Sequence, residues 1–81
     1  MNAAEAQEVK NLLLQEDDQY RALAEQHHEL DDRLHQLTER HYLSDSEQFE
    51  EATLKKRKLA LKDRMEEMAR MYAQHQEPHG H

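Results

Sequence analysis

Hydrophobic residues recur at helical spacing through two long stretches of the chain. In the first stretch, with Leu13 taken as heptad position a, positions a and d hold Leu or Tyr in most of four heptads. In the second stretch, large apolar residues fall at 54, 61, 65, 68 and 72, in steps of three, four and seven residues. Such spacing places the apolar residues on one side of an α-helix. A mean spacing of 3.5 residues is typical of helices that pack in a coiled coil.

The elements follow from this pattern and from the residues that interrupt it. Neither Gly nor Pro occurs between residues 4 and 41, so we expect helix 1 over about 4–41. A turn is predicted at about 42–45 and helix 2 at about 45–74. The domain organisation we expect is a frayed acidic extension at 1–9, an α-hairpin at 10–74, and a disordered His-containing tail at 75–81 that holds the single Pro and Gly.

A capping box is predicted where helix 2 begins. Ser44 and Glu47 have the required spacing, in which each side chain bonds the backbone amide of the other residue. Asp45 or Ser46 could cap the helix instead, which would move its start by a residue or two.

A short connection makes the two helices antiparallel neighbours. One register then pairs Leu34 with Leu54 and Leu23 with Met65, so that the two apolar stripes face each other. The predicted fold is all-α: an antiparallel two-helix hairpin with coiled-coil-like packing that assembles into a four-helix bundle. The predicted interface residues are Leu13, Tyr20, Leu23, His27, Leu30, Leu34, Leu37, Leu54, Lys58, Leu61, Met65, Met68 and Tyr72.

Composition indicates that this hairpin needs a partner. The chain has 81 residues, of which 36% are hydrophobic and 36% are charged. Domains of this size usually need a disulfide, a bound metal or a partner chain to stabilise the fold. The absence of cysteine excludes disulfides and Cys-based zinc sites. We therefore expect a homo-oligomer, with a dimer favoured. The possible oligomer surface is a second, weaker apolar set formed by Leu12, Leu14, Phe49, Ala52 and Leu59.

Charge and targeting signals favour a soluble cytoplasmic protein with no membrane partner. The longest apolar run, Leu12–Leu14, is far shorter than the roughly 20 residues that span a bilayer, and the acidic start does not resemble a signal peptide. The net charge is −7, and residues 1–40 hold ten acids and four bases, whereas residues 47–73 hold six acids and seven bases. This asymmetry suits two segments that pack on each other.

Two sequence motifs are similar to those of a known family. His27-x-x-Leu30-Asp31, followed by Leu-Lys-Lys-x-Lys-Leu-x-Leu-Lys-Asp over 54–63, resembles the YdcH-like family of small bacterial proteins. The likeness covers about residues 10–70. It implies a helical hairpin and a bacterial source, and because the family is one of unknown function, it implies no activity, cofactor or site.

Lys58 is the one charged residue of the predicted interface of helix 2. In one interpretation its stem covers the interface and its ammonium group reaches water. In the other, His27, Asp31 and Lys58 form a polar cluster that sets the register of the two helices, as a single buried polar residue does in coiled coils. The sequence leaves both interpretations open.

Other candidate chemistry is weak. The bases at 55–58 point in many directions around a helix and alternate with acids, which argues against nucleic acid and for ion pairing. Glu25 and His28 have a di-metal spacing but lie off the apolar stripe. Histidines in the tail could bind Zn²⁺ or Ni²⁺ weakly: His75, His79 and His81. We expect no biological metal site and no cofactor.

The sequence contains no signature of catalysis. It has no nucleophile–base pair and no Gly-rich phosphate loop, and an interface one residue wide leaves no room for a substrate pocket of a few hundred Å³. We therefore expect a non-enzymatic, self-associating interaction or adaptor module with an unknown protein partner. The alternative is a regulatory factor that contacts nucleic acid through the basic helix 2.

Overall fold

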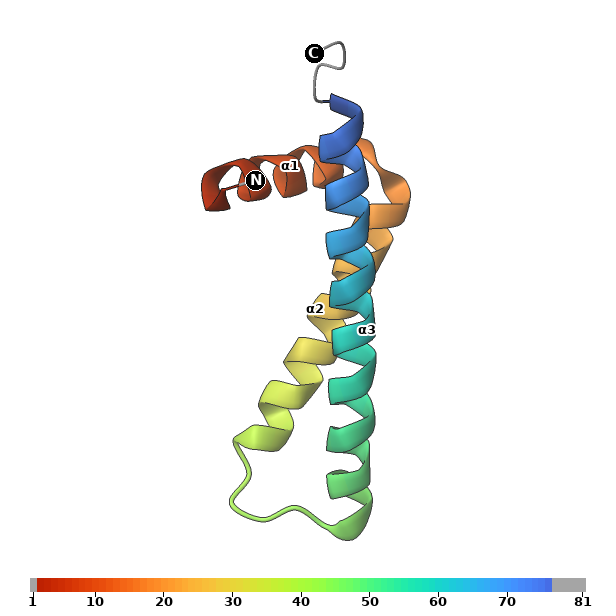
Figure 1. The fold of residues 1–81 in the computed structure, drawn as a ribbon. Helices are drawn as coiled ribbons and strands as arrows, with labels where there is room; N and C mark the ends of the chain where they lie inside the picture. The colour runs from red at the N-terminus through yellow and green to blue at the C-terminus, as the bar shows by residue number, and fades with distance from the viewer. Residues whose placement is uncertain (1, 77–81) are drawn as a thin grey trace.

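The computed structural model describes residues 2–76 and contains three α-helices with no strand in that range. These are α1 (Ala3–Glu16), α2 (Asp18–Thr38) and α3 (Asp45–Gln76). The all-α prediction is confirmed. α2 and α3 lie alongside each other and are joined at one end by residues 39–44, whereas α1 projects sideways at the other end (Figure 1).

The single helix expected over 4–41 is divided at Asp17, so that prediction was wrong. Asp17 has extended backbone angles, φ −113° and ψ 111°. Its amide donates to the carbonyl of Leu13 at 2.9 Å, and its carboxylate accepts from the amide of Tyr20 at 2.9 Å. Aspartate is a favoured helix N-cap. This local hydrogen bond therefore starts a new helix although the heptad pattern continues through it.

The N-terminal residues are helical, whereas we expected them to fray. α1 begins at Ala3, and the side chain of Asn2 caps it by accepting from the amide of Glu5 at 2.9 Å. Residues 3–9 of the predicted extension thus belong to α1.

The predicted capping box is confirmed at the start of α3. The amide of Ser44 donates to the carboxylate of Glu47 at 3.1 Å, and the amide of Glu47 donates to the hydroxyl of Ser44 at 3.2 Å. α3 then continues two residues beyond the predicted end, and α2 ends at Thr38 instead of 41. Of the tail expected to be disordered, residues 75 and 76 are helical and residues 77–81 lie outside the described residues.

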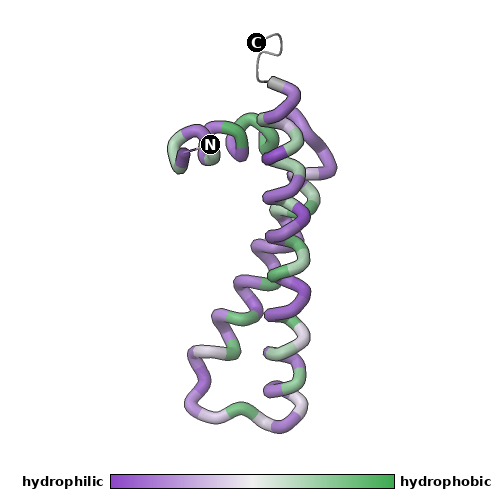
Figure 2. Tube along the Cα trace, viewed as in Figure 1, coloured by the Kyte–Doolittle hydropathy of each residue, from purple (hydrophilic) through white to green (hydrophobic). Residues whose placement is uncertain are grey.

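The apolar core consists of two separate clusters. The first joins all three helices through the buried residues Leu13, Tyr20 and Ala69. The second lies near the 39–44 loop and contains Leu34, Leu37 and Leu54. The hydrophobic residues of α1 gather in its C-terminal half, where it meets the other helices (Figure 2). Leu13 therefore ties α1 to the α2–α3 pair.

Candidate functional site

All thirteen predicted interface residues are buried or half-buried. Five of them are buried hydrophobic residues: Leu13, Tyr20, Leu34, Leu37 and Leu54. Ala69 was not among the predicted interface residues, yet it is 2% exposed and packs in the first cluster. The helical spacing would have predicted it, because Ala69 lies four residues after Met65 and three before Tyr72. The prediction used large apolar side chains alone, so alanine was passed over.

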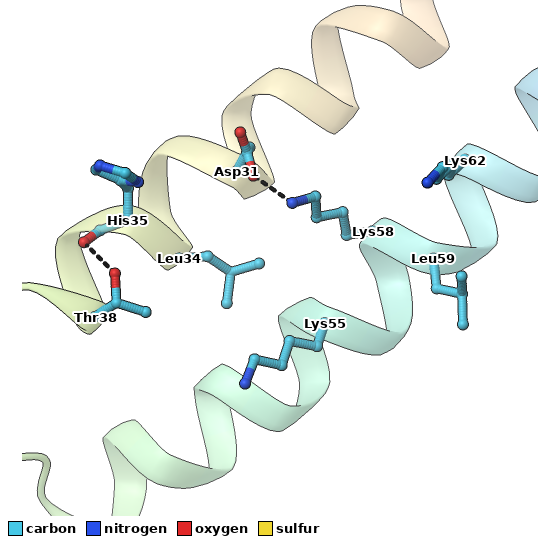
Figure 3. Close-up of a pocket in the computed structure, with 8 residues that line it drawn as sticks. All are labelled: Asp31, Leu34, His35, Thr38, Lys55, Lys58, Leu59 and Lys62. Carbon is cyan, nitrogen blue, oxygen red and sulfur yellow. Dashed lines mark hydrogen bonds and ion pairs between the residues drawn. The ribbon is translucent and has the colours of Figure 1, made fainter.

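Two of the three residues of the polar cluster proposed from the sequence, Asp31 and Lys58, form a contact between α2 and α3. The ammonium group of Lys58 donates a hydrogen bond to the carboxylate of Asp31, and the two side chains point toward each other across the gap (Figure 3). This bond and the charge of Lys58 hold the pKa of Asp31 below its usual value, and the charge of His27 acts in the same direction. The Lys58 side chain is 34% exposed. The two core clusters lie on either side of this pair, and its role in setting the register stays a prediction.

A second ion pair, which the sequence motifs did not predict, joins the helices near the loop. The guanidinium of Arg33 binds both carboxylate oxygens of Glu50, at 2.8 and 2.9 Å. The hydrogen bond from Arg33 lowers the pKa of Glu50, and the bond to Glu50 raises the pKa of Arg33. Arg40 pairs with Glu47 beside it. Such forked pairs fix geometry as well as charge, so this end of the helix pair is held by ion pairs around its apolar cluster.

A groove on one side of the helix pair has three lysines among its eight lining residues, and we call it the lysine groove. Its volume is about 420 Å³ and it is lined by the eight residues labelled in Figure 3. Leu34 points from α2 toward α3. The α3 side carries Lys55, Lys58 and Lys62, with Leu59 at the outer edge. Cationic side chains thus border a partly apolar surface.

The charge of the lysine groove is only partly neutralised. Lys58 is paired with Asp31, and Lys55 lies 3.6 Å from the carboxylate of Glu51. Lys62 has no acidic partner within 4 Å in the described part of the chain. A neighbouring groove of about 320 Å³ shares Lys58 and Lys62 and continues to Lys10 of α1. The lysine side of the molecule therefore extends from the α2–α3 pair toward α1.

The expectation of no hollow of this size was wrong. A groove of about 400 Å³ also lies on the opposite side of the pair, lined by Leu23, Leu30 and Leu61 with Arg57 and Arg64 at its border. Two packed helices are rounded in cross-section, so hollows remain on both flanks of a narrow interface. Both hollows are surface grooves along the helix pair. They can accept an elongated partner such as a helix.

The residues of the possible oligomer surface do not all gather in one place. Phe49, Ala52 and Leu59 lie on the side of α3 away from α2 by their helical spacing, and all three are exposed. Leu12 and Leu14 lie on α1, at the other end of the molecule, where Leu12 is half-buried and Leu14 is 39% exposed. The structure therefore separates this set into an α3 part and an α1 part.

The metal candidates remain apart on the surface. Glu25 and His28 are both exposed, and His28 lies 3.4 Å from Asp32. Among residues 2–76 no group of three or more His, Asp or Glu side chains is arranged to hold a metal ion. His75 lies in α3, and His79 and His81 fall outside the described residues.

Five of the seven lysines and arginines of α3 are divided between the two grooves. Lys55, Lys58 and Lys62 line the lysine groove, whereas Arg57 and Arg64 border the opposite groove. Continuous tracking of a phosphate backbone needs bases on one face, so this division does not favour the nucleic-acid alternative.

Comparison with known proteins identifies a family. A family model described as "Protein of unknown function (DUF465)" matches residues 21–72, more than half of the chain. The matched residues cover most of α2, the loop and most of α3, and leave α1 outside. Neither a curated protein nor a solved structure matches the chain significantly. In the described residues, none of the helices has the length and apolar content needed to span a bilayer.

Proposed function

The chain belongs to the DUF465 family of proteins of unknown function, which includes the YdcH-like proteins, and we propose that it is a small non-enzymatic interaction module. The resemblance noted in the sequence is thereby confirmed. Family membership carries no activity, so the proposal rests on the surfaces of the molecule. We place the protein in the cytoplasm, where it acts by binding to itself and to a further protein.

The working unit in this proposal is the α2–α3 pair, acting as an antiparallel hairpin with coiled-coil-like packing. Contacts between positions far apart in the chain support it, because Arg33 bonds to Glu50 and Asp31 bonds to Lys58. Two such hairpins would pack as a four-helix bundle with two-fold symmetry.

The observation that supports self-association is the exposure of apolar residues on α3. Phe49 is 75% exposed and Leu59 is 58% exposed, although both are large hydrophobic residues. At the same time, only six hydrophobic residues are buried in the described chain. Burial of apolar surface contributes roughly 25 cal/mol per Å². A second copy that covers Phe49, Ala52 and Leu59 would therefore add apolar burial that the single chain lacks.

Sedimentation velocity at micromolar concentration tests this proposal. We expect the wild-type chain to sediment as a dimer and the double variant Phe49→Glu, Leu59→Glu to sediment as a monomer with an unchanged far-UV circular dichroism spectrum. Tyr42→Glu is the control, because it replaces another exposed large hydrophobic residue by glutamate, at a loop position that is 85% exposed; it should remain a dimer. A wild-type monomer at every concentration up to 100-fold higher would overturn the proposal.

A further inference from the structure

One side of α1 is acidic, and of its glutamates Glu16 alone has a side-chain partner among residues 2–76, because it accepts a hydrogen bond from the hydroxyl of Tyr72 at 3.4 Å. Glu5, Glu8, Leu12 and Glu16 follow one another at steps of three and four residues, which places them on one side of the helix. This side lies next to the one that packs through Leu13. Neither Glu5 nor Glu8 has a cationic partner within 4 Å among residues 2–76. Both are exposed, and Leu12 between Glu8 and Glu16 is half-buried.

The lysine groove carries the complementary pattern. Lys55, Leu59 and Lys62 follow one another at steps of four and three residues on α3, and Glu8, Leu12 and Glu16 follow one another at two steps of four on α1. In both cases a leucine stands between two charged residues, and the charges are opposite. Leu59 is 58% exposed, and Lys62 lacks an acidic partner in the described residues. An acidic helix with a central leucine therefore fits this groove in charge and in apolar content.

The acidic side of α1 does not reach the lysine groove of its own chain. Leu13 holds α1 in the cluster with Tyr20 and Ala69, and Asp17 turns the helix outward, so that it projects away from the helix pair (Figure 1). Its own Lys10 lines the groove beside the lysine groove. The α1 helix cannot reach the lysine groove of its own chain, but the α1 helix of a second copy can.

We propose that, in the self-associated form, α1 of one copy lies in the lysine groove of a second copy. Leu12 packs against Leu59, and Glu8 lies beside the lysines of the groove, with Glu5 one turn further along α1. This inference rests on the proposed self-association and names the segment that completes it. Reciprocal exchange of α1 between two copies gives a closed dimer with two identical contacts. α1 has 14 residues and is on the order of 20 Å long, which is enough to cover the two turns of α3 between Lys55 and Lys62.

The electrostatics of this contact determine how it responds to salt. Each copy has a net charge of −7, so two copies repel each other at long range. At about 0.15 M salt the screening length is roughly 8 Å, and charges in direct apposition still attract. Complementary charges of this kind give specificity more than affinity. We therefore expect the dimer to weaken when NaCl is raised from about 0.15 to 1 M.

Charge reversal tests the contact. The arm variant carries Glu5→Lys and Glu8→Lys, and the groove variant carries Lys55→Glu and Lys62→Glu. We expect each variant alone to dimerise about tenfold or more weakly than wild type by sedimentation equilibrium. An equimolar mixture of the two should form a heterodimer of near wild-type affinity, because each α1 then meets a groove of opposite charge. The matched control is Glu25→Lys with Glu29→Lys, which changes the charge of exposed positions on α2 by the same amount and should not weaken the dimer.

The outcomes separate this inference from the proposed function. If wild type dimerises and the arm and groove variants dimerise equally well, α1 does not lie in the groove, although self-association stands. If the groove variant is weakened and the mixture is not rescued, the lysine groove binds a different acidic segment, which also overturns the inference. A wild-type monomer under all conditions removes the proposed self-association itself.

Discussion

Lys58 donates a hydrogen bond to Asp31 across the α2–α3 interface, between the two apolar clusters of the core. Leu34 and Leu54 pack on one side of this contact, and Tyr20 and Ala69 pack on the other. Both charged side chains are partly exposed, at 34% and 51%. Pairs with this exposure contribute little to stability. The contact is therefore better suited to choosing one alignment of the helices than to holding them together.

Replacing Lys58 with Met tests this role. Methionine would join the two clusters into one apolar strip, so we expect thermal stability to be unchanged or higher and more than one set of backbone amide signals in NMR, because the helices can then shift in register. Lys56→Met, at an exposed position of α3 away from the interface, is the control and should give one set. A Lys58→Met protein with a single set of signals and an unchanged oligomeric state would show that Lys58 does not set the register.

Leu37 is the most deeply buried residue of the second core cluster, the one near the 39–44 loop, and has no exposed surface. Replacing it with Ala removes a side chain from a packed site, and such changes typically cost about 2–5 kcal/mol. We expect Leu37→Ala to lower the free energy of unfolding by an amount in this range, measured by urea denaturation. Leu14→Ala is the matched control, since Leu14 is 39% exposed, and it should cost much less. Equal losses in the two variants would mean that the cluster does not stabilise the fold.

Asp17 divides the N-terminal part of the chain into two helices. Asp17→Ala removes the carboxylate that accepts from the amide of Tyr20, and the loss of such a cap costs about 0.5–2 kcal/mol. We also expect α1 and α2 to merge, which would raise the helical signal at 222 nm and increase the distance between spin labels placed at positions 4 and 60. Asp18→Ala is the control, because the Asp18 side chain is 96% exposed and caps no helix. An unchanged label distance in Asp17→Ala would mean that the packing of Leu13, and not the cap, holds α1 in place.

The long-range pattern of the fold could be predicted from the sequence because periodicity reports which side of a helix is apolar. The interface residues predicted in this way run from Leu13 to Tyr72, and every one of them is buried or half-buried. The capping box at Ser44 was found because it is a contact between residues three positions apart. Local signals and regular spacing are both visible in a single sequence.

The features that were not predicted are of two kinds. In some, one sequence pattern masks another, and in others the residues that meet are far apart in the sequence. The heptad pattern continues without a break through Asp17, so it predicted one helix where the Asp17 cap starts a second one. Ala69 is too small to mark an apolar stripe, yet its small size permits the close approach of Leu13 and Tyr20. Arg33 and Glu50 are separated by 17 positions, and pairing them requires the angle and register of the two helices. The lysine groove could not be predicted for the same reason.

Acid should weaken the fold, because three carboxylates have pKa values that folding lowers. Hydrogen bonds from Lys58, Ser44 and Arg33 lower the pKa of Asp31, Glu47 and Glu50 respectively, from ordinary values of 3.8, 4.5 and 4.5.

A group whose pKa is lower in the folded state contributes stability that is fully present above its unfolded pKa and is lost as pH falls through its folded pKa. The melting temperature should therefore be constant from about pH 7 to 5.5 and should fall progressively below pH 4.5. Circular dichroism melts from pH 7 to 2.5 measure this, and in Glu50→Gln the fall should be smaller, because one of the three groups no longer titrates. If Glu50→Gln loses as much as wild type over the same interval, the pair between Arg33 and Glu50 does not stabilise the folded state.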